Sequence, residues 1–182
     1  MGEPSPGSVY YPAQTLTVGV EGLLSRIELE VWRVSGDAPL TVWLFPLLQE
    51  FNPPVFGPQL GAVLLTVDEV PRSPGTVILD VAILGVMVHP GERLAIGLQT
   101  ELQNSFIWAA DYPNSYNGGI SYTFHLRPLD GPVWYNANSD AVFRTFVDPV
   151  GRVPVPEPAT LALFVFGLGA LLITRRTRST HD

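Results

Sequence analysis

The sequence has 182 residues and a net charge of -7, from ten basic and seventeen acidic side chains. Its length suits one domain of about 150 residues with a tail. The acidic balance argues against nucleic acid as a partner, and the lack of cysteine excludes disulfides, thiol catalysis and cysteine-based zinc sites.

Residues 1–148 show a dominant period of two. Ile27, Leu29 and Val31 alternate with polar or amphipathic neighbours, which is typical of a half-buried antiparallel strand. Similar short runs, separated by Pro, Gly, Asn and Asp, are LTVWLFPL, GAVLLTV, TVILDVAIL, ERLAIGLQT, SFIWAA, GISYTFHL and DAVFRTFV. About eight to ten strands follow from this spacing. We predict an all-β, antiparallel β-sandwich over residues 1–148, jelly-roll-like, with an immunoglobulin-like sandwich as the alternative.

Two stretches, FIWAADYPNSYNGG and GPVWYNANSD, have the composition of loops rich in aromatic, Asn and Asp residues. Flat aromatic rings can stack on sugar rings, while Asp and Asn side chains hydrogen-bond to hydroxyl groups. The candidate ligand-binding residues are Trp108, Asp111, Tyr112, Tyr116, Trp134 and Asp140, with Asn117, Tyr135 and Asn136 beside them. The same oxygens suit a structural calcium ion. The alternative is that Asn and Asp cap tight turns and the aromatic residues close the ends of the sandwich.

Motifs of enzymes are not found in the chain. It has no G-x-S-x-G elbow, no H-E-x-x-H and no phosphate-binding loop, and of its three histidines only His125 falls on a predicted strand. We therefore expect a protein that is not an enzyme and needs no cofactor. A polysaccharide-acting enzyme on the same scaffold is the alternative, because a pair of carboxylates suited to glycoside hydrolysis cannot be recognised from spacing.

The last part of the chain changes character. Residues 149–158 form a proline-rich linker, residues 159–174 carry no charge, and residues 175–182 are a basic tail. As a helix, these sixteen uncharged residues would span about 24 Å, somewhat less than the roughly 30 Å hydrocarbon core of a bilayer. We predict a single transmembrane helix over 159–174, with the arginines in the cytoplasm and residues 1–148 outside it.

This C-terminal pattern resembles the PEP-CTERM protein-sorting signal of Gram-negative bacteria. The resemblance is carried by Pro156, Glu157 and Pro158, the apolar segment that follows, and Arg175, Arg176 and Arg178. It implies recognition by exosortase, a membrane-embedded peptidase, with processing near the PEP motif. Proteins with this signal commonly accompany exopolysaccharide production, so an extracellular polysaccharide is a further expected partner.

Export of residues 1–148 requires a leader, yet the stretch MGEPSPGSVYYPAQ has no basic start and no apolar run. We therefore expect the natural start to lie upstream of Met1. The sequence predicts a structural or adhesive protein with carbohydrate affinity. It would be held in the inner membrane by 159–174 until exosortase processing delivers it to the cell surface or extracellular matrix.

Overall fold

The computed structural model describes residues 9–50, 53–100, 105–111, 116–127 and 131–149. The chain divides into two units, Met1–Val150 and Gly151–Asp182. The predicted transmembrane helix and basic tail lie outside the described residues.

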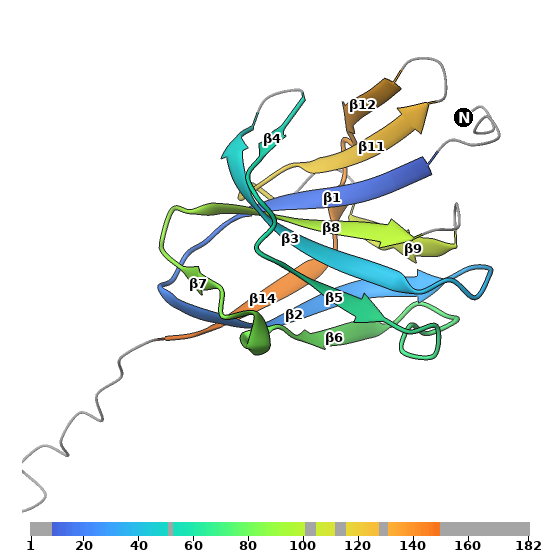
Figure 1. Cartoon of the computed structure of the whole chain (residues 1–182), viewed down its shortest axis with the longest axis horizontal. Helices are drawn as coiled ribbons and strands as arrows, with labels where there is room; N and C mark the ends of the chain where they lie inside the picture. The colour runs from blue at the N-terminus through green and yellow to red at the C-terminus, as the bar shows by residue number, and fades with distance from the viewer. Residues whose placement is uncertain (1–8, 51–52, 101–104, 112–115, 128–130, 150–182) are drawn as a thin grey trace, which may run out of the picture. The chain divides into compact units, whose positions relative to one another are not determined.

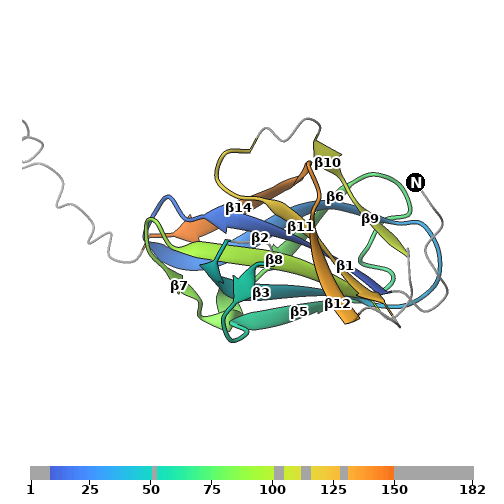
Figure 2. The ribbon, with the colours of Figure 1, turned by 90° about the horizontal axis from the view of Figure 1, so that it is seen from above.

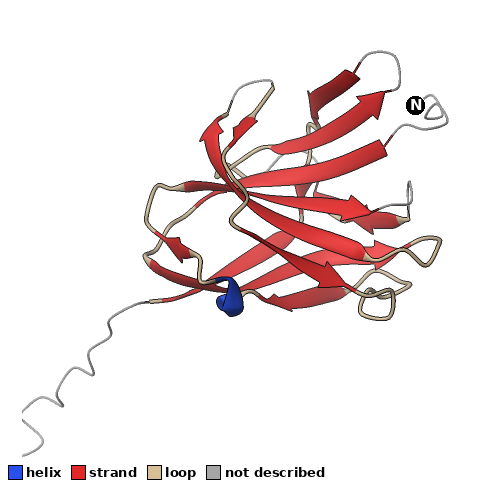
Figure 3. Ribbon diagram, viewed as in Figure 1, coloured by secondary structure: helices blue, strands red, loops and turns tan. Residues whose placement is uncertain are grey.

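Strands make up nearly all of the regular structure, and one short 3-10 helix accompanies them (Figure 3). In chain order the elements are β1 (Val9–Thr17), β2 (Gly22–Arg33), β3 (Leu40–Gln49), β4 (Val55–Phe56), β5 (Gly61–Leu65), β6 (Thr76–Asp80), η1 (Ala82–Leu84), β7 (Met87–Val88), β8 (Arg93–Thr100), β9 (Phe106–Trp108), β10 (Ala110–Asp111), β11 (Ser121–Arg127), β12 (Gly131–Asn136), β13 (Asp140–Ala141) and β14 (Phe143–Asp148).

These strands form two main antiparallel sheets (Figures 1 and 2). The seven-stranded sheet has the order β12-β11-β1-β8-β3-β4, and β5 also pairs with β3. The five-stranded sheet is centred on β2, which pairs with β14, β6, β7 and β9. A small ribbon joins β10 to β13. The first strand therefore lies inside its sheet, between β11 and β8.

Strand β2 shows why the sequence forms these sheets. Ile27, Leu29 and Val31 are completely buried, while Glu28 and Glu30 between them are partly exposed. Because successive side chains of a strand point to opposite faces, this alternation puts one face into the core and the other toward solvent. The period-two prediction for this segment is confirmed.

The core lies between the two sheets. It receives aliphatic side chains from β1, β3, β5 and β8 of one sheet and from β2 and β6 of the other. Full burial of each such side chain contributes about 1.5–3 kcal/mol relative to exposure.

The all-β, antiparallel prediction is confirmed. The jelly-roll-like topology, with its immunoglobulin-like alternative, stays a prediction. The loop assignment of GPVWYNANSD is wrong over Gly131–Asn136, because this segment is strand β12, paired with β11. Tyr122 opposite Asn136 and Phe124 opposite Trp134 show the register of this pairing.

Candidate functional site

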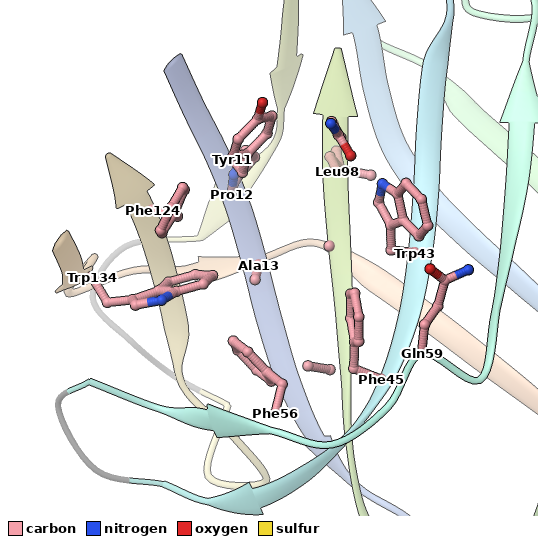
Figure 4. A pocket seen from close by; sticks show the side chains of 13 residues that line it. Tyr11, Pro12, Ala13, Trp43, Phe45, Phe56, Gln59, Leu98, Phe124 and Trp134 are labelled. Atoms are coloured by element: carbon pink, nitrogen blue, oxygen red, sulfur yellow. The ribbon is translucent and has the colours of Figure 1, made fainter. Parts of the chain in front are cut away.

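A groove lined mainly by aromatic side chains lies on the face of the seven-stranded sheet that points away from the core (Figure 4). Its volume is about 330 Å³, within the range of small-molecule sites. We call it the aromatic groove. Its lining residues are Tyr11, Pro12, Ala13, Trp43, Phe45, Phe56, Gln59, Ala95, Gly97, Leu98, Gln99, Phe124 and Trp134.

The alternation of strand β3 explains why aromatic residues reach this face. Val42 and Leu44 are buried in the core, so Trp43 and Phe45 point to the opposite side of the sheet. There, both rings are only partly buried. The groove is thus formed by side chains that point away from the core.

Six rings form a continuous arc around the groove. Neighbouring ring centroids along the arc lie 4.9 to 6.3 Å apart, within the normal range for aromatic pairs. In order, the rings are Trp43, Phe45, Phe56, Trp134, Phe124 and Tyr11. Figure 4 shows them surrounding Ala13, with Trp134 and Phe124 on one side and Trp43 on the other. The arc therefore combines rings from five strands.

Small residues make the floor of the groove. Ala13 on β1 is directly paired with Gly97 on β8, and Ala95 lies two residues before Gly97 on the same face. A Cβ atom added at Gly97 would meet only the carbonyl oxygen of Pro12 and the Cβ atom of Trp43, both at 4.0 Å. The floor is low because these side chains are short, which leaves room for a ligand.

None of the described residues that line the groove is charged. Polar contacts can come from the exposed amides of Gln59 and Gln99 and from the Tyr11 hydroxyl. The indole N–H of Trp43 is enclosed and has no hydrogen-bond partner among the described residues. The lining thus offers ring faces with a few neutral hydrogen-bonding groups.

A network of polar side chains lies next to the groove floor, on the same face of the seven-stranded sheet. Thr15 on β1 donates its hydroxyl to Glu50 (3.0 Å), and Glu50 forms an ion pair with Arg93 on β8. Thr15 Oγ1 also accepts a hydrogen bond from the backbone N–H of Ile120 (2.6 Å). The Arg93 cation is therefore already paired with a carboxylate.

Tyr122 lies on β11, two residues before Phe124, and is almost completely buried, with its ring edge-on to Trp134 at 6.3 Å. Burial raises the pKa of the Tyr122 hydroxyl above its ordinary value, although the nearby Arg93 opposes this shift. The phenol therefore stays neutral under ordinary conditions and supports the Trp134 ring.

Trp108, one of the predicted ligand-binding residues, packs against the core rather than the groove. It lies on β9, and its indole N–H donates to the carbonyl oxygen of Val142 (2.9 Å). This bond links β9 to the segment just before β14. Trp134 does line the groove, so the two predicted tryptophans are in different places.

Asp111, Tyr116 and Asp140 come together in a separate surface hollow. Asp111 and Asp140 are paired across the β10–β13 ribbon. Asp140 is only 3% exposed, and its carboxylate accepts hydrogen bonds from the Tyr116 backbone N–H (2.6 Å) and from Gln14 Nε2 (3.5 Å). Gln14 Oε1 in turn accepts from the Ala141 N–H (2.8 Å). We call Asp140, Gln14, Tyr116 and Ala141 the Asp140 cluster.

The Tyr116 side chain packs against Phe143 beside this cluster. Its ring lies edge-on to Phe143 at 5.5 Å, and burial raises the pKa of its hydroxyl. Asn117 and Asn136 are exposed, whereas Tyr112 and the sorting residues Pro156, Glu157, Pro158, Arg175, Arg176 and Arg178 lie outside the described residues.

Five of the six arc rings were not among the candidates taken from the sequence. They are Tyr11, Trp43, Phe45, Phe56 and Phe124. A local signal was present in TVWLF, where both faces of the strand are apolar, and in LAIGLQ, where small residues alternate with large aliphatic ones. Such a pattern indicates a strand with a ligand or packing partner on its outer face.

Within the described ranges, no helix is both long and apolar enough to cross a bilayer. In these ranges, too, no three His, Asp or Glu side chains gather closely enough to hold a metal ion. Structural calcium stays a prediction.

Comparison with known proteins bears on the C-terminal segment. Neither a curated protein nor a solved structure matches this chain. Residues 154–179 match the family described as the PEP-CTERM protein-sorting motif. This range includes all the predicted sorting residues. The match supports an exported, membrane-anchored protein that exosortase processes. The chain therefore carries a PEP-CTERM protein-sorting motif over residues 154–179.

Proposed function

We propose that residues 159–174 hold this protein in the inner membrane until exosortase cuts near Pro156–Pro158, after which it reaches the cell surface or extracellular matrix. The order of the parts supports this proposal: a proline-rich stretch, an apolar segment and then arginines. Prolines favour an extended backbone that a peptidase cleft can grip, and the arginines stop transfer through the membrane.

The processing step is tested by expressing the full chain with and without its exosortase and measuring the product mass. The wild type should yield a shortened product only when exosortase is present. Glu157→Gln should block this cleavage, while Glu92→Gln, the same change at an exposed position of the β unit, should leave it intact. Full-length wild-type protein in the presence of active exosortase would contradict the proposal.

We further propose that the β unit is a carbohydrate-binding, adhesive module. The single observation that carries this is the continuous arc of six rings over a floor of small residues. The C–H faces of sugar rings stack on aromatic faces, and amides such as those of Gln59 and Gln99 suit hydroxyl groups. We propose the aromatic groove, rather than the Asp140 cluster, as the binding site.

The enzymatic alternative needs two carboxylates on either side of a glycosidic bond. The described lining of the groove contains no carboxylate, so binding without turnover is the favoured activity.

Binding is measured by calorimetry on the full chain in lipid nanodiscs, with neutral cello-, xylo-, manno- and galacto-oligosaccharides. At least one should bind, and Trp134→Ala should weaken it about tenfold, since a Trp face carries much of a stacking contact. Tyr135→Ala, at the neighbouring position on the other face of β12, is the matched control. Release of shorter sugars during the titration would favour the enzyme instead.

A further inference from the structure

We infer that the aromatic groove selects uncharged glycans and rejects those rich in uronic acids. This inference rests on the proposed carbohydrate binding. It follows from the chemistry of the groove lining and from the charge of the residues around it.

The lining cannot neutralise a carboxylate. None of its described residues is a cation, and the ring faces that dominate it carry the negative side of the aromatic quadrupole. A uronate placed against these faces would lose water without gaining an ionic partner, which is costly. A neutral hexose loses less hydration and can hydrogen-bond with Gln59 and Gln99.

Arg93, a cation on the same face of the sheet, cannot easily supply the missing ionic partner. Arg93 lies two residues before the floor residue Ala95 and is held in an ion pair with Glu50. Arg93 and Glu50 are 33% and 18% exposed, so their pair is partly shielded from water. Recruiting Arg93 to an anionic ligand would leave the Glu50 carboxylate without its cation, at a further cost.

The charge of the whole region adds a long-range contribution. Residues 1–148 contain fifteen acidic residues but only six arginines and no lysine. This excess repels anionic polymers, and salt screens it over a Debye length of about 8 Å at physiological ionic strength. The local contribution from the lining is screened much less. Salt therefore separates the two contributions.

The test uses glycan pairs that share a backbone and differ in charge. The probes are polygalacturonate with its fully methyl-esterified form, and cello-oligosaccharides with their C6-carboxylated counterparts, titrated into the full chain in nanodiscs. We expect the neutral member to bind at least about tenfold tighter. Raising salt from about 0.15 M to about 1 M should remove only part of this difference in affinity between the neutral and charged members.

Two matched variants locate the selectivity. Gln99→Arg puts a cation in the groove lining and should raise affinity for the charged member several-fold, whereas Gln49→Arg adds the same charge at an exposed position outside the lining. Equal gains from both variants would overturn the assignment to the groove.

The outcomes distinguish this inference from the proposed function. Equal or tighter wild-type binding of the charged members would overturn the inference while leaving carbohydrate binding in place. Failure to bind any member of either pair, or any of the neutral cello-, xylo-, manno- and galacto-oligosaccharides, would overturn the proposed function and the inference together.

Discussion

The aromatic groove and the Asp140 cluster use similar residue types for different ends. In the groove, six half-buried rings face a hollow, and none of the described lining residues is charged. In the cluster, Asp140 is buried, and both of its carboxylate oxygens accept hydrogen bonds from within the chain. The groove therefore exposes aromatic surface that a ligand can contact, whereas the polar groups of the cluster are hydrogen-bonded within the chain and stabilise the fold.

The contrast shows that residue type alone does not identify a binding site. Asp140, Tyr116 and Trp108 have the chemistry of ligand contacts, yet each has a structural partner at close range. Trp43 and Phe45 look like core residues in the sequence but lie on the outer face of β3. A side chain that already has partners within the chain is less available to a ligand than one that faces the groove.

Removing the Asp140 carboxylate should have the largest effect on stability. Asp140→Ala leaves the Tyr116 N–H and the Gln14 amide without their acceptor, so we expect a loss of about 3 kcal/mol in the free energy of unfolding. Urea unfolding of the full chain measures this loss. Asp68→Ala, at an exposed turn, should stay within about 0.5 kcal/mol of the wild type. A change of similar size in both variants would show that the cluster is not structural.

Filling the groove should separate binding from stability. Gly97→Leu places a large side chain over the floor, where an added Cβ atom meets nothing closer than 4.0 Å. We expect glycan affinity to fall about tenfold, or about 1.4 kcal/mol, with the free energy of unfolding within about 1 kcal/mol of the wild type. Gly97→Ala is the control and should bind nearly normally. Unchanged affinity in Gly97→Leu would argue against the groove as the binding site.

The smallest expected effect is an alkaline loss of stability through Tyr122. Its pKa is raised above 10.0 by burial in the folded state, so on raising the pH the unfolded state releases this proton first. The stability that comes from keeping the Tyr122 hydroxyl protonated is therefore fully present below about pH 10. It is lost as the pH rises through the folded-state pKa.

Unfolding measured from about pH 9 to about pH 11 should show this decline. Tyr122→Phe keeps the ring edge-on to Trp134 and should make the decline shallower, although Tyr116 still contributes to it. An identical decline in Tyr122→Phe would remove the assigned role of this hydroxyl.

Features encoded in one contiguous stretch were predictable from the sequence. The alternation of Ile27, Leu29 and Val31 predicts the buried face of β2, and the order of proline, apolar and arginine residues predicts the sorting motif. Both follow from residues close together in the chain.

The aromatic groove could not be predicted in this way, because its rings come from β1, β3, β4, β11 and β12 and meet only through the order and register of the sheet. The same is true of the Asp140 cluster, in which Gln14 and Asp140 are separated by 126 residues. Only Trp134 belongs both to the groove and to the candidates taken from the sequence.

The most direct test compares two tryptophans under one substitution. Trp43→Ala removes a ring from the arc, whereas Trp108→Ala removes one that is bonded to Val142 outside it. At a temperature where both variants stay folded, titration with the neutral glycan should show about tenfold weaker binding for Trp43→Ala and an affinity within about twofold of the wild type for Trp108→Ala. Weakened binding in Trp108→Ala with normal binding in Trp43→Ala would contradict the account.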